Sequence, residues 1–262
     1  MHWLLVPALV AALPQEEAPK VKATLVAEHE AVAPGQTAWV GVRMEIEKGW
    51  HTYWNGRNQT GTPPIIKWKL PEGFKAGEVQ WPGPTRYIAY DSLDHVHEGR
   101  VLLMVPIEVP AAAKPGSRVE VSAQCMFVVC KEVCLMERAS PSLTLTIAEP
   151  GGTPRPTAAA KDFEKARAAL PVPIAKADGV KARVEKGVLV VEAKDAQRVS
   201  FFPAEDCAET PEILTQGEAK GPVLRVSLVP TPQARRVKGV AEVVRKDSKQ
   251  PTFVTIDLEV PR

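Results

Sequence analysis

Short apolar runs of alternating polarity fill this 262-residue chain and constrain its fold more than any other feature. Runs such as VKATLVAEH, RVLLMVPIEVP and SLTLTIAEP alternate apolar and polar residues and contain many β-branched side chains. A period of two places successive side chains on opposite faces of a β-strand. Prolines, 25 in all, recur between the runs, and proline is poorly tolerated inside helices and central strands. The sequence therefore predicts an all-β protein built as a sandwich or barrel.

The chain length and one proline- and glycine-rich interruption predict two domains. A length of 262 residues exceeds the usual size of a single domain. The segment EPGGTPRPT at 149–157 has no apolar periodicity, as is typical of a linker. We expect residues 20–148 to form the first domain and residues 158–262 to form a second, smaller β domain.

The second half of the chain opens with a helical pattern before strands resume. Phe163, Ala166 and Leu170 stand at helical spacing, and Pro171 follows them. One short amphipathic helix is therefore expected at the start of the second domain. Strand-like runs then return, the first two of which meet at Lys186 and Gly187, so this dipeptide predicts a hairpin turn.

The first residues, MHWLLVPALVAA, resemble a signal peptide. Small residues at Val10 and Ala12 occupy the positions that precede a cleavage site. We expect residues 1–19 to be a signal peptide and a disordered start, which makes the protein exported; a buried amino-terminal strand is the alternative. The stretch is shorter than the roughly 20 apolar residues that span a bilayer, and no later run reaches that length. No membrane span of its own is expected.

The charge pattern argues against nucleic acid as a partner. The formal net charge is +2, with both signs scattered along the chain. A protein that binds a phosphate backbone needs a cluster of basic residues. No pattern in the sequence indicates nucleotide or hydrolase chemistry, and no cofactor is expected.

Cys130 and Cys134 are the most informative of the four cysteines. Along one continuous strand their Cα atoms would lie about 13 Å apart, far beyond the reach of a disulfide. Because strand-like sequence flanks both, the chain is expected to turn between them and bring the sulfurs together across a hairpin. So small a loop adds little stability, which favours redox chemistry, and Lys131 would favour a reactive thiolate. A purely structural disulfide is the alternative.

Cys125 and Cys207 allow two interpretations. They could form a second thiol pair, which would cross between the two domains. Each could equally be a buried free thiol.

The residues around the cysteines resemble a known family. Residues 49–84 read GWHTYWNGRNQTGTPPIIKWKLPEGFKAGEVQWPGP, and HEGRVLLMVPIEVP and FVVCKEVCLME follow in order. This series is similar to the amino-terminal periplasmic domain of DsbD-type thiol:disulfide interchange proteins, including their copper-tolerance relatives. The resemblance runs from about Val21 to Ile147, and is weaker around RVSFFPAE and VKGVAEVV.

The resemblance implies an immunoglobulin-like β-sandwich and a redox role for Cys130 and Cys134. In such a protein the pair accepts electrons from a membrane electron-transfer partner and passes them to periplasmic thioredoxin-fold proteins. Cys134 would form the mixed disulfide with the downstream partner. The loop at residues 87–98 would cover the pair; its candidate residues are Tyr87, Tyr90, His95 and His97.

This sequence departs from the family pattern in three places. Phe127 replaces a tryptophan, Met136 replaces a proline, and His95 and His97 replace tyrosines in the covering loop. The family's transmembrane and thioredoxin-like domains are also absent from this sequence. An electron donor is therefore expected to be a separate protein.

Two other functions compete with thiol-disulfide exchange. His95 and His97 lie on one face of an extended segment and, with Cys130 and Cys134, could bind copper or zinc; solvation of two histidines in a polar loop is the simpler interpretation. A non-catalytic interaction module with a structural disulfide is the other alternative. The protein is an oxidoreductase-type enzyme only if the cysteine pair is redox-active.

Overall fold

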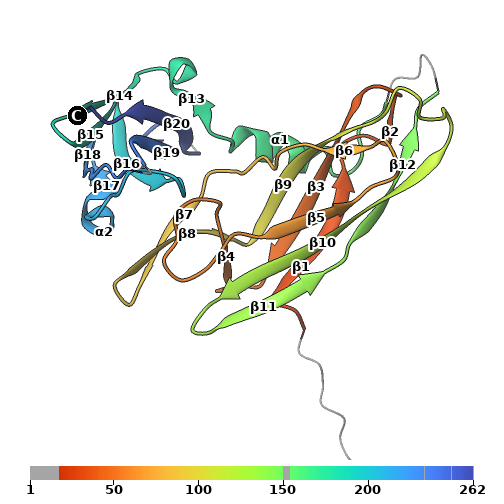
Figure 1. Ribbon diagram of the computed structural model, residues 1–262, viewed down its shortest axis with the longest axis horizontal. Helices are drawn as coiled ribbons and strands as arrows, with labels where there is room; N and C mark the ends of the chain where they lie inside the picture. The colour runs from red at the N-terminus through yellow and green to blue at the C-terminus, as the bar shows by residue number, and fades with distance from the viewer. Residues whose placement is uncertain (1–17, 150–153, 233, 249, 262) are drawn as a thin grey trace, which may run out of the picture.

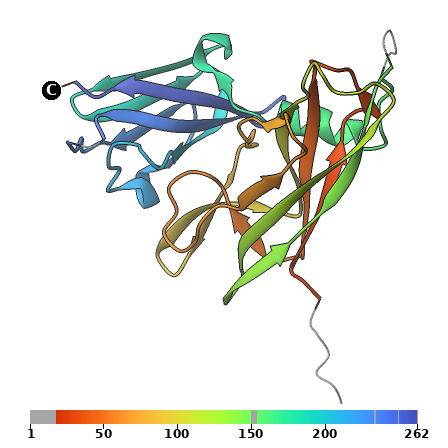
Figure 2. The ribbon, with the colours of Figure 1, turned by 45° about the vertical axis from the view of Figure 1, so that its right-hand side comes forward.

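The computed structural model describes residues 18–149, 154–232, 234–248 and 250–261. Its strands form four sheets, which pair into two β-sandwiches joined through a short helix (Figures 1 and 2). The predicted all-β architecture, with a second and smaller β domain, is confirmed. Most of the predicted signal peptide, residues 1–17, lies outside the described residues. Within the described residues, no helix is long and apolar enough to cross a membrane.

The amino-terminal sandwich consists of a four-stranded sheet and a larger, eight-stranded sheet. The first sheet has the order β1 (Val21–Ala27), β3 (Thr37–Ile46), β9 (Arg100–Glu108), β6 (Lys75–Ala76). The main path of the second is β2 (Ala31–Val32), β12 (Ser142–Ile147), β10 (Arg118–Cys130), β4 (His51–Tyr53), β8 (Ser92–Glu98), β7 (Thr85–Ala89). Strands β5 (Ile65–Lys69) and β11 (Cys134–Ala139) also pair with β10. The core lies between the sheets because alternate residues such as Val40, Val42, Phe127 and Val129 point inward and are fully buried.

The carboxyl-terminal sandwich packs a five-stranded sheet on a three-stranded one. The larger sheet has the order β13 (Val172–Pro173), β20 (Thr252–Glu259), β19 (Arg236–Arg245), β16 (Ala196–Pro203), β17 (Glu218–Lys220). The smaller has the order β14 (Val180–Glu185), β15 (Val188–Ala193), β18 (Val223–Ser227). Short helical turns stand at Ile174–Lys176 and at α2 (Ile213–Gln216). The hairpin predicted at Lys186 and Gly187 is confirmed: both residues have positive φ, as a tight hairpin turn requires.

Helix α1 (Ala160–Ala168) packs on the first sandwich, although the sequence pattern assigned it to the second. Phe163 is fully buried against Leu102 and Met104, which lie on the outer face of β9. Arg167 adds two hydrogen bonds of 2.6 Å to the carboxylate of Glu28. The helical spacing predicted the apolar face of the helix, but the apolar residues on the outer face of β9 decided which domain would cover it.

The domain boundary at 149–157 stays a prediction. From residue 154 onward the backbone still pairs with the first sandwich: Glu30 N donates to Arg155 O at 2.8 Å, and Thr157 N donates to Glu28 O at 2.9 Å. Together with the packing of α1, these contacts favour a later connection, near Leu170 and β13.

An aromatic cluster joins the two sandwiches. Trp54 packs with Phe202, Val240 and Phe253 of the second sandwich, and Trp81 lies against them. The backbone contributes as well, because Gly56 forms a β-bridge with Ala204. Burial of large aromatic side chains supplies much of the stability of such an interface. The contact holds the loop that follows β4 against the second sandwich.

We predict that Phe163→Ala lowers the free energy of unfolding by about 3 to 5 kcal/mol, because it leaves a cavity between α1 and β9. Urea denaturation of the whole chain measures this change. Lys161→Ala, at an exposed position of the same helix, is the control and should alter stability by less than about 0.5 kcal/mol. A loss below about 1 kcal/mol for Phe163→Ala would contradict the packing of the helix.

Candidate functional site

Cys130 and Cys134 close the hairpin between β10 and β11. The two residues are direct cross-strand partners, and their sulfurs form a disulfide with a Cα–Cα distance of 4.1 Å. The turn between them is stabilised by a hydrogen bond of 3.1 Å from Lys131 N to Val133 O. The chain therefore turns between the cysteines, as their spacing required.

The two sulfurs occupy different environments. Cys130 is 3% exposed, because β10 is paired there with β11 on one side and with His51 of β4 on the other. Cys134 is exposed on β11, for which the described residues give no strand partner besides β10. The apolar side chains around Cys134 are exposed as well; they are Val133, Leu135 and Met136. An incoming thiol can therefore reach Cys134, whereas Cys130 is shielded.

Tyr53 contacts the buried sulfur. Its ring is fully buried in a cluster with Cys130 and Val96, and its hydroxyl lies 2.9 Å from Cys130 Sγ and 3.9 Å from Cys134 Sγ. The same hydroxyl lies 2.9 Å from Thr60 Oγ1. Burial raises the pKa of the Tyr53 phenol, which keeps it protonated at neutral pH. The site thus offers a hydrogen-bond donor to one sulfur in preference to the other.

The loop at residues 55–64 covers Tyr53, a role that the sequence analysis did not assign to it. A Cβ atom on Gly61 would lie 2.1 Å from the Tyr53 ring, so the backbone can approach only because the residue is glycine. Asn58 shapes the loop: its side-chain amide donates to Trp54 O and Gly56 O. The glycines and asparagines of the segment NGRNQTGT indicate a turn, but a turn alone does not reveal what it covers.

The predicted covering segment, residues 87–98, is a hairpin of β7 and β8 rather than a loop. Tyr87 packs beside the site, with its ring centroid 4.3 Å from that of His51. Tyr90 stands at the turn and is 91% exposed. In both ribbon views the tip of this hairpin and the tip of the β10–β11 hairpin lie on the same side of the molecule (Figures 1 and 2). Tyr87 and Val96 shield Cys130, while Cys134 stays open.

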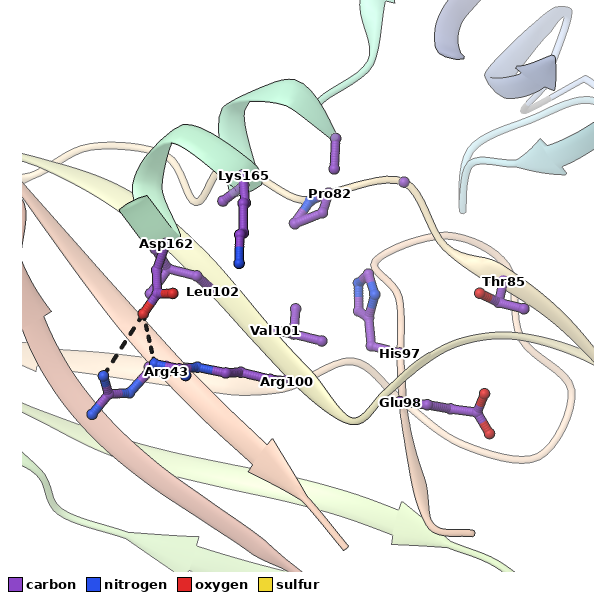
Figure 3. A pocket seen from close by; sticks show the side chains of 13 residues that line it. Arg43, Pro82, Thr85, His97, Glu98, Arg100, Val101, Leu102, Asp162 and Lys165 are labelled. Atoms are coloured by element: carbon purple, nitrogen blue, oxygen red, sulfur yellow. Dashed lines mark hydrogen bonds and ion pairs between the residues drawn. The ribbon is translucent and has the colours of Figure 1, made fainter. Parts of the chain in front are cut away.

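His95 and His97 are buried on the face of β8 that points away from the sulfurs. His95 packs edge-on against Phe202, and its Nδ1 lies 2.7 Å from Arg57 O. His97 stacks on Trp81 and borders a hollow of about 490 Å³ beneath α1 (Figure 3). The interpretation of these histidines as solvated is therefore wrong, because the second sandwich and α1 cover this face. Neither histidine meets the disulfide, and the described residues contain no group of three or more metal-binding side chains.

Cys125 and Cys207 are free thiols in separate cores. Cys125 points into the first sandwich, and its burial raises the pKa of the thiol to about 11. Burial also raises the pKa of Cys207 in the second sandwich. The second thiol pair is therefore not formed, since each side chain is enclosed within its own domain.

The fold and the cysteine geometry agree with the comparison to known families. Residues 22–146 match the family described as thiol:disulfide interchange protein DsbD, N-terminal. The domain that carries the disulfide belongs to this family. The match ends before α1, so the second sandwich lies outside it.

A solved structure is similar over nearly the whole chain. The N-terminal periplasmic domain of ScsB from Proteus mirabilis shares 15% identity, with 96% of this chain and 97% of that chain covered and a TM-score of 0.60. At this identity the likeness concerns the fold, and it extends to both sandwiches. The major pilin subunit BcpA of Bacillus cereus follows, with 10% identity, 94% and 67% coverage and a TM-score of 0.30, too low to argue from. No curated protein matches the sequence.

We predict that the stability of the protein falls as the pH drops from about 6.5 to about 4. Burial lowers the pKa values of His95 and His97 from 6.5 to about 4. In this window the unfolded chain binds protons that the folded chain excludes, so each histidine can remove up to about 3 kcal/mol from the free energy of unfolding. Above 6.5 both states are neutral at these positions and the effect vanishes.

Denaturation midpoints measured at steps between pH 7.5 and 4 test this prediction. His97→Phe keeps an aromatic ring on Trp81 and removes one titrating group, so its stability should depend less steeply on pH than that of the wild type. Equal slopes for the two proteins would show that His97 does not contribute.

Proposed function

We propose that this protein is a periplasmic thiol-disulfide exchange protein that acts through Cys130 and Cys134. It receives electrons from a membrane electron-transfer partner and passes them to periplasmic thioredoxin-fold proteins. The family of the first domain supports this proposal, as does the asymmetry of the disulfide, which is the observation that carries it. One sulfur is exposed for attack and the other is buried behind it.

The chemistry follows from this asymmetry. Thiol-disulfide exchange proceeds by attack of a thiolate on one sulfur, through a mixed disulfide with the partner. Cys134 is the sulfur that a partner can reach, and the exposed Val133, Leu135 and Met136 provide apolar contact area beside it. With the membrane partner, Cys130 leaves as the thiolate and a second thiol of that partner releases Cys134, which completes the reduction of the pair. With an oxidised thioredoxin-fold partner, Cys134 forms the mixed disulfide and Cys130 resolves it, which re-forms the Cys130–Cys134 disulfide. A membrane partner and a periplasmic partner would use the same exposed sulfur in turn.

The alternative functions have less support. A copper or zinc site built from His95, His97 and the thiols would require side chains that lie on opposite faces of β8 to converge. A purely structural disulfide does not account for an exposed Cys134 among exposed apolar side chains, because a structural disulfide gains nothing from exposure. The reduction potential of the Cys130–Cys134 disulfide distinguishes a structural bridge from a redox-active one, since structural disulfides have potentials below about −300 mV.

We predict that Cys130→Ser traps a mixed disulfide between Cys134 and a thioredoxin-fold protein, because no internal thiol remains to resolve it. Cys134→Ser should trap none, since the remaining Cys130 is buried. Incubation with an oxidised thioredoxin-fold protein, followed by non-reducing electrophoresis and mass spectrometry, identifies the linkage. Cys125→Ser, combined with Cys130→Ser, is the matched control and should leave the trapping by Cys134 unchanged.

The reverse pattern would assign the attack to Cys130 and leave the redox function standing. Absence of trapping by both variants, together with a wild-type potential below about −300 mV, would make the disulfide structural and contradict the proposed function.

A further inference from the structure

A line of close polar contacts runs from a buried carboxylate to the sulfur of Cys130. Thr60 Oγ1 donates to Asp94 Oδ2 at 2.6 Å. The Tyr53 hydroxyl lies 2.9 Å from Thr60 Oγ1 and 2.9 Å from Cys130 Sγ. Asp94 is itself buried, and its Oδ1 accepts hydrogen bonds from the backbone N–H groups of Gln59 and Thr60. The line therefore starts at an anchored charge and ends at one of the two sulfurs.

The hydroxyl hydrogens are too few for every contact in this line to be a hydrogen bond at once. A threonine hydroxyl has one hydrogen, and that of Thr60 is used at Asp94. Thr60 Oγ1 can then only accept from Tyr53, which leaves the single phenol hydrogen of Tyr53 with two acceptors, Thr60 Oγ1 and Cys130 Sγ. A disulfide sulfur is a weak acceptor, whereas an ionised acceptor forms a hydrogen bond about twice as strong. The phenol hydrogen therefore turns from Thr60 Oγ1 to Cys130 Sγ when Cys130 acquires negative charge.

We propose that Tyr53 is a catalytic residue that stabilises the Cys130 thiolate, and that Thr60, oriented by Asp94, is the positioning residue that holds the phenol hydrogen while the disulfide is intact. This inference rests on the proposed function and names further residues of the same site. An interaction that is stronger in the charged state than in the disulfide accelerates the exchange step itself.

The exchange step balances without any further reactant. A partner thiolate attacks Cys134 Sγ, the partner–Cys134 bond forms, the Cys130–Cys134 bond breaks, and Cys130 departs with the electron pair. In the opposite direction the Cys130 thiolate attacks Cys134 Sγ of the mixed disulfide, and the partner leaves as its thiolate. Tyr53 donates a hydrogen bond in both directions and retains its proton, consistent with the raised pKa of its buried phenol.

The first test removes the hydroxyl with Tyr53→Phe in the whole chain. Loss of a hydrogen bond to a charged sulfur should slow reduction of the disulfide by dithiothreitol by about 10- to 100-fold. The thiol pKa of Cys130, followed by NMR of ¹³Cβ-labelled cysteine in a Cys134→Ser background, should rise by about one unit or more. The thiol pKa of Cys134 in a Cys130→Ser background should not change, a selectivity that general loosening of the site would not produce.

The second test separates positioning from packing. Thr60→Val keeps the shape of the side chain and removes the acceptor that competes with Cys130 Sγ for the phenol hydrogen, so it should lower the thiol pKa of Cys130 and speed reduction by about three- to tenfold. Thr52→Val is the matched control: it removes a buried hydroxyl from the same strand as Tyr53, one that donates instead to Val128 O at 3.0 Å. It should alter neither the rate nor the pKa of Cys130.

The outcomes distinguish this inference from the proposed function. An unchanged Cys130 pKa in Tyr53→Phe, or an equal slowing by Thr52→Val, would overturn the role of Tyr53 while partner trapping by Cys130→Ser still stood. If Tyr53→Phe does not fold, Thr60→Val decides in its place, and reduction as slow as or slower than that of the wild type would overturn the inference. Failure of Cys130→Ser to trap any partner would instead remove the proposed function on which the inference rests.

Discussion

The backbone pairing of strand β10 connects the core of the first sandwich to its disulfide. Along its length β10 pairs with β12, β11, β5 and β4, so its register is fixed from both sides. Alternation then sends Phe127 and Val129 into the core and presents Cys130 on the opposite, outer face. A shift of one residue would bury the sulfur in the apolar core and expose a core side chain. The hydrophobic pattern that folds the sandwich therefore also sets the position of the cysteine.

The alternation of side chains along a strand also gives β8 two different faces. Asp94 and Val96 lie toward Tyr53 and Cys130, whereas His95 and His97 lie toward the second sandwich and α1. The loop after β4 repeats this double contact, because Thr60 and Gly61 rest on Tyr53 while Gly56 bridges to Ala204. The segments that surround the buried sulfur are thus also the segments held by the second sandwich, and its contacts support the geometry of the site.

Sequence patterns predicted the strands and the helix of this fold better than they predicted the surfaces on which those elements pack. The strands, the Lys186–Gly187 hairpin and the turn between the cysteines follow from local periodicity and chain geometry, which neighbouring residues determine. Helix α1 was predicted from its spacing, but its docking on β9 depends on a surface about 60 residues earlier in the chain. His95 and His97 were read as solvated because their neighbours are polar, and the covering domain could not be seen from the segment itself.

From the residues alone follow the all-β character of the chain, the turn that brings Cys130 and Cys134 together, and the resemblance to a thiol-disulfide interchange family. Those features depend on residue types and spacings within short windows. Only the tertiary structure decided which sulfur is exposed, that Cys125 and Cys207 stay apart, and that Tyr53, Thr60 and Asp94 form a line to Cys130. Thr60 and Asp94 are 34 residues apart in the sequence, and Tyr53 and Cys130 are 77 residues apart. Only sheet pairing and loop packing bring such distant residues within hydrogen-bond distance.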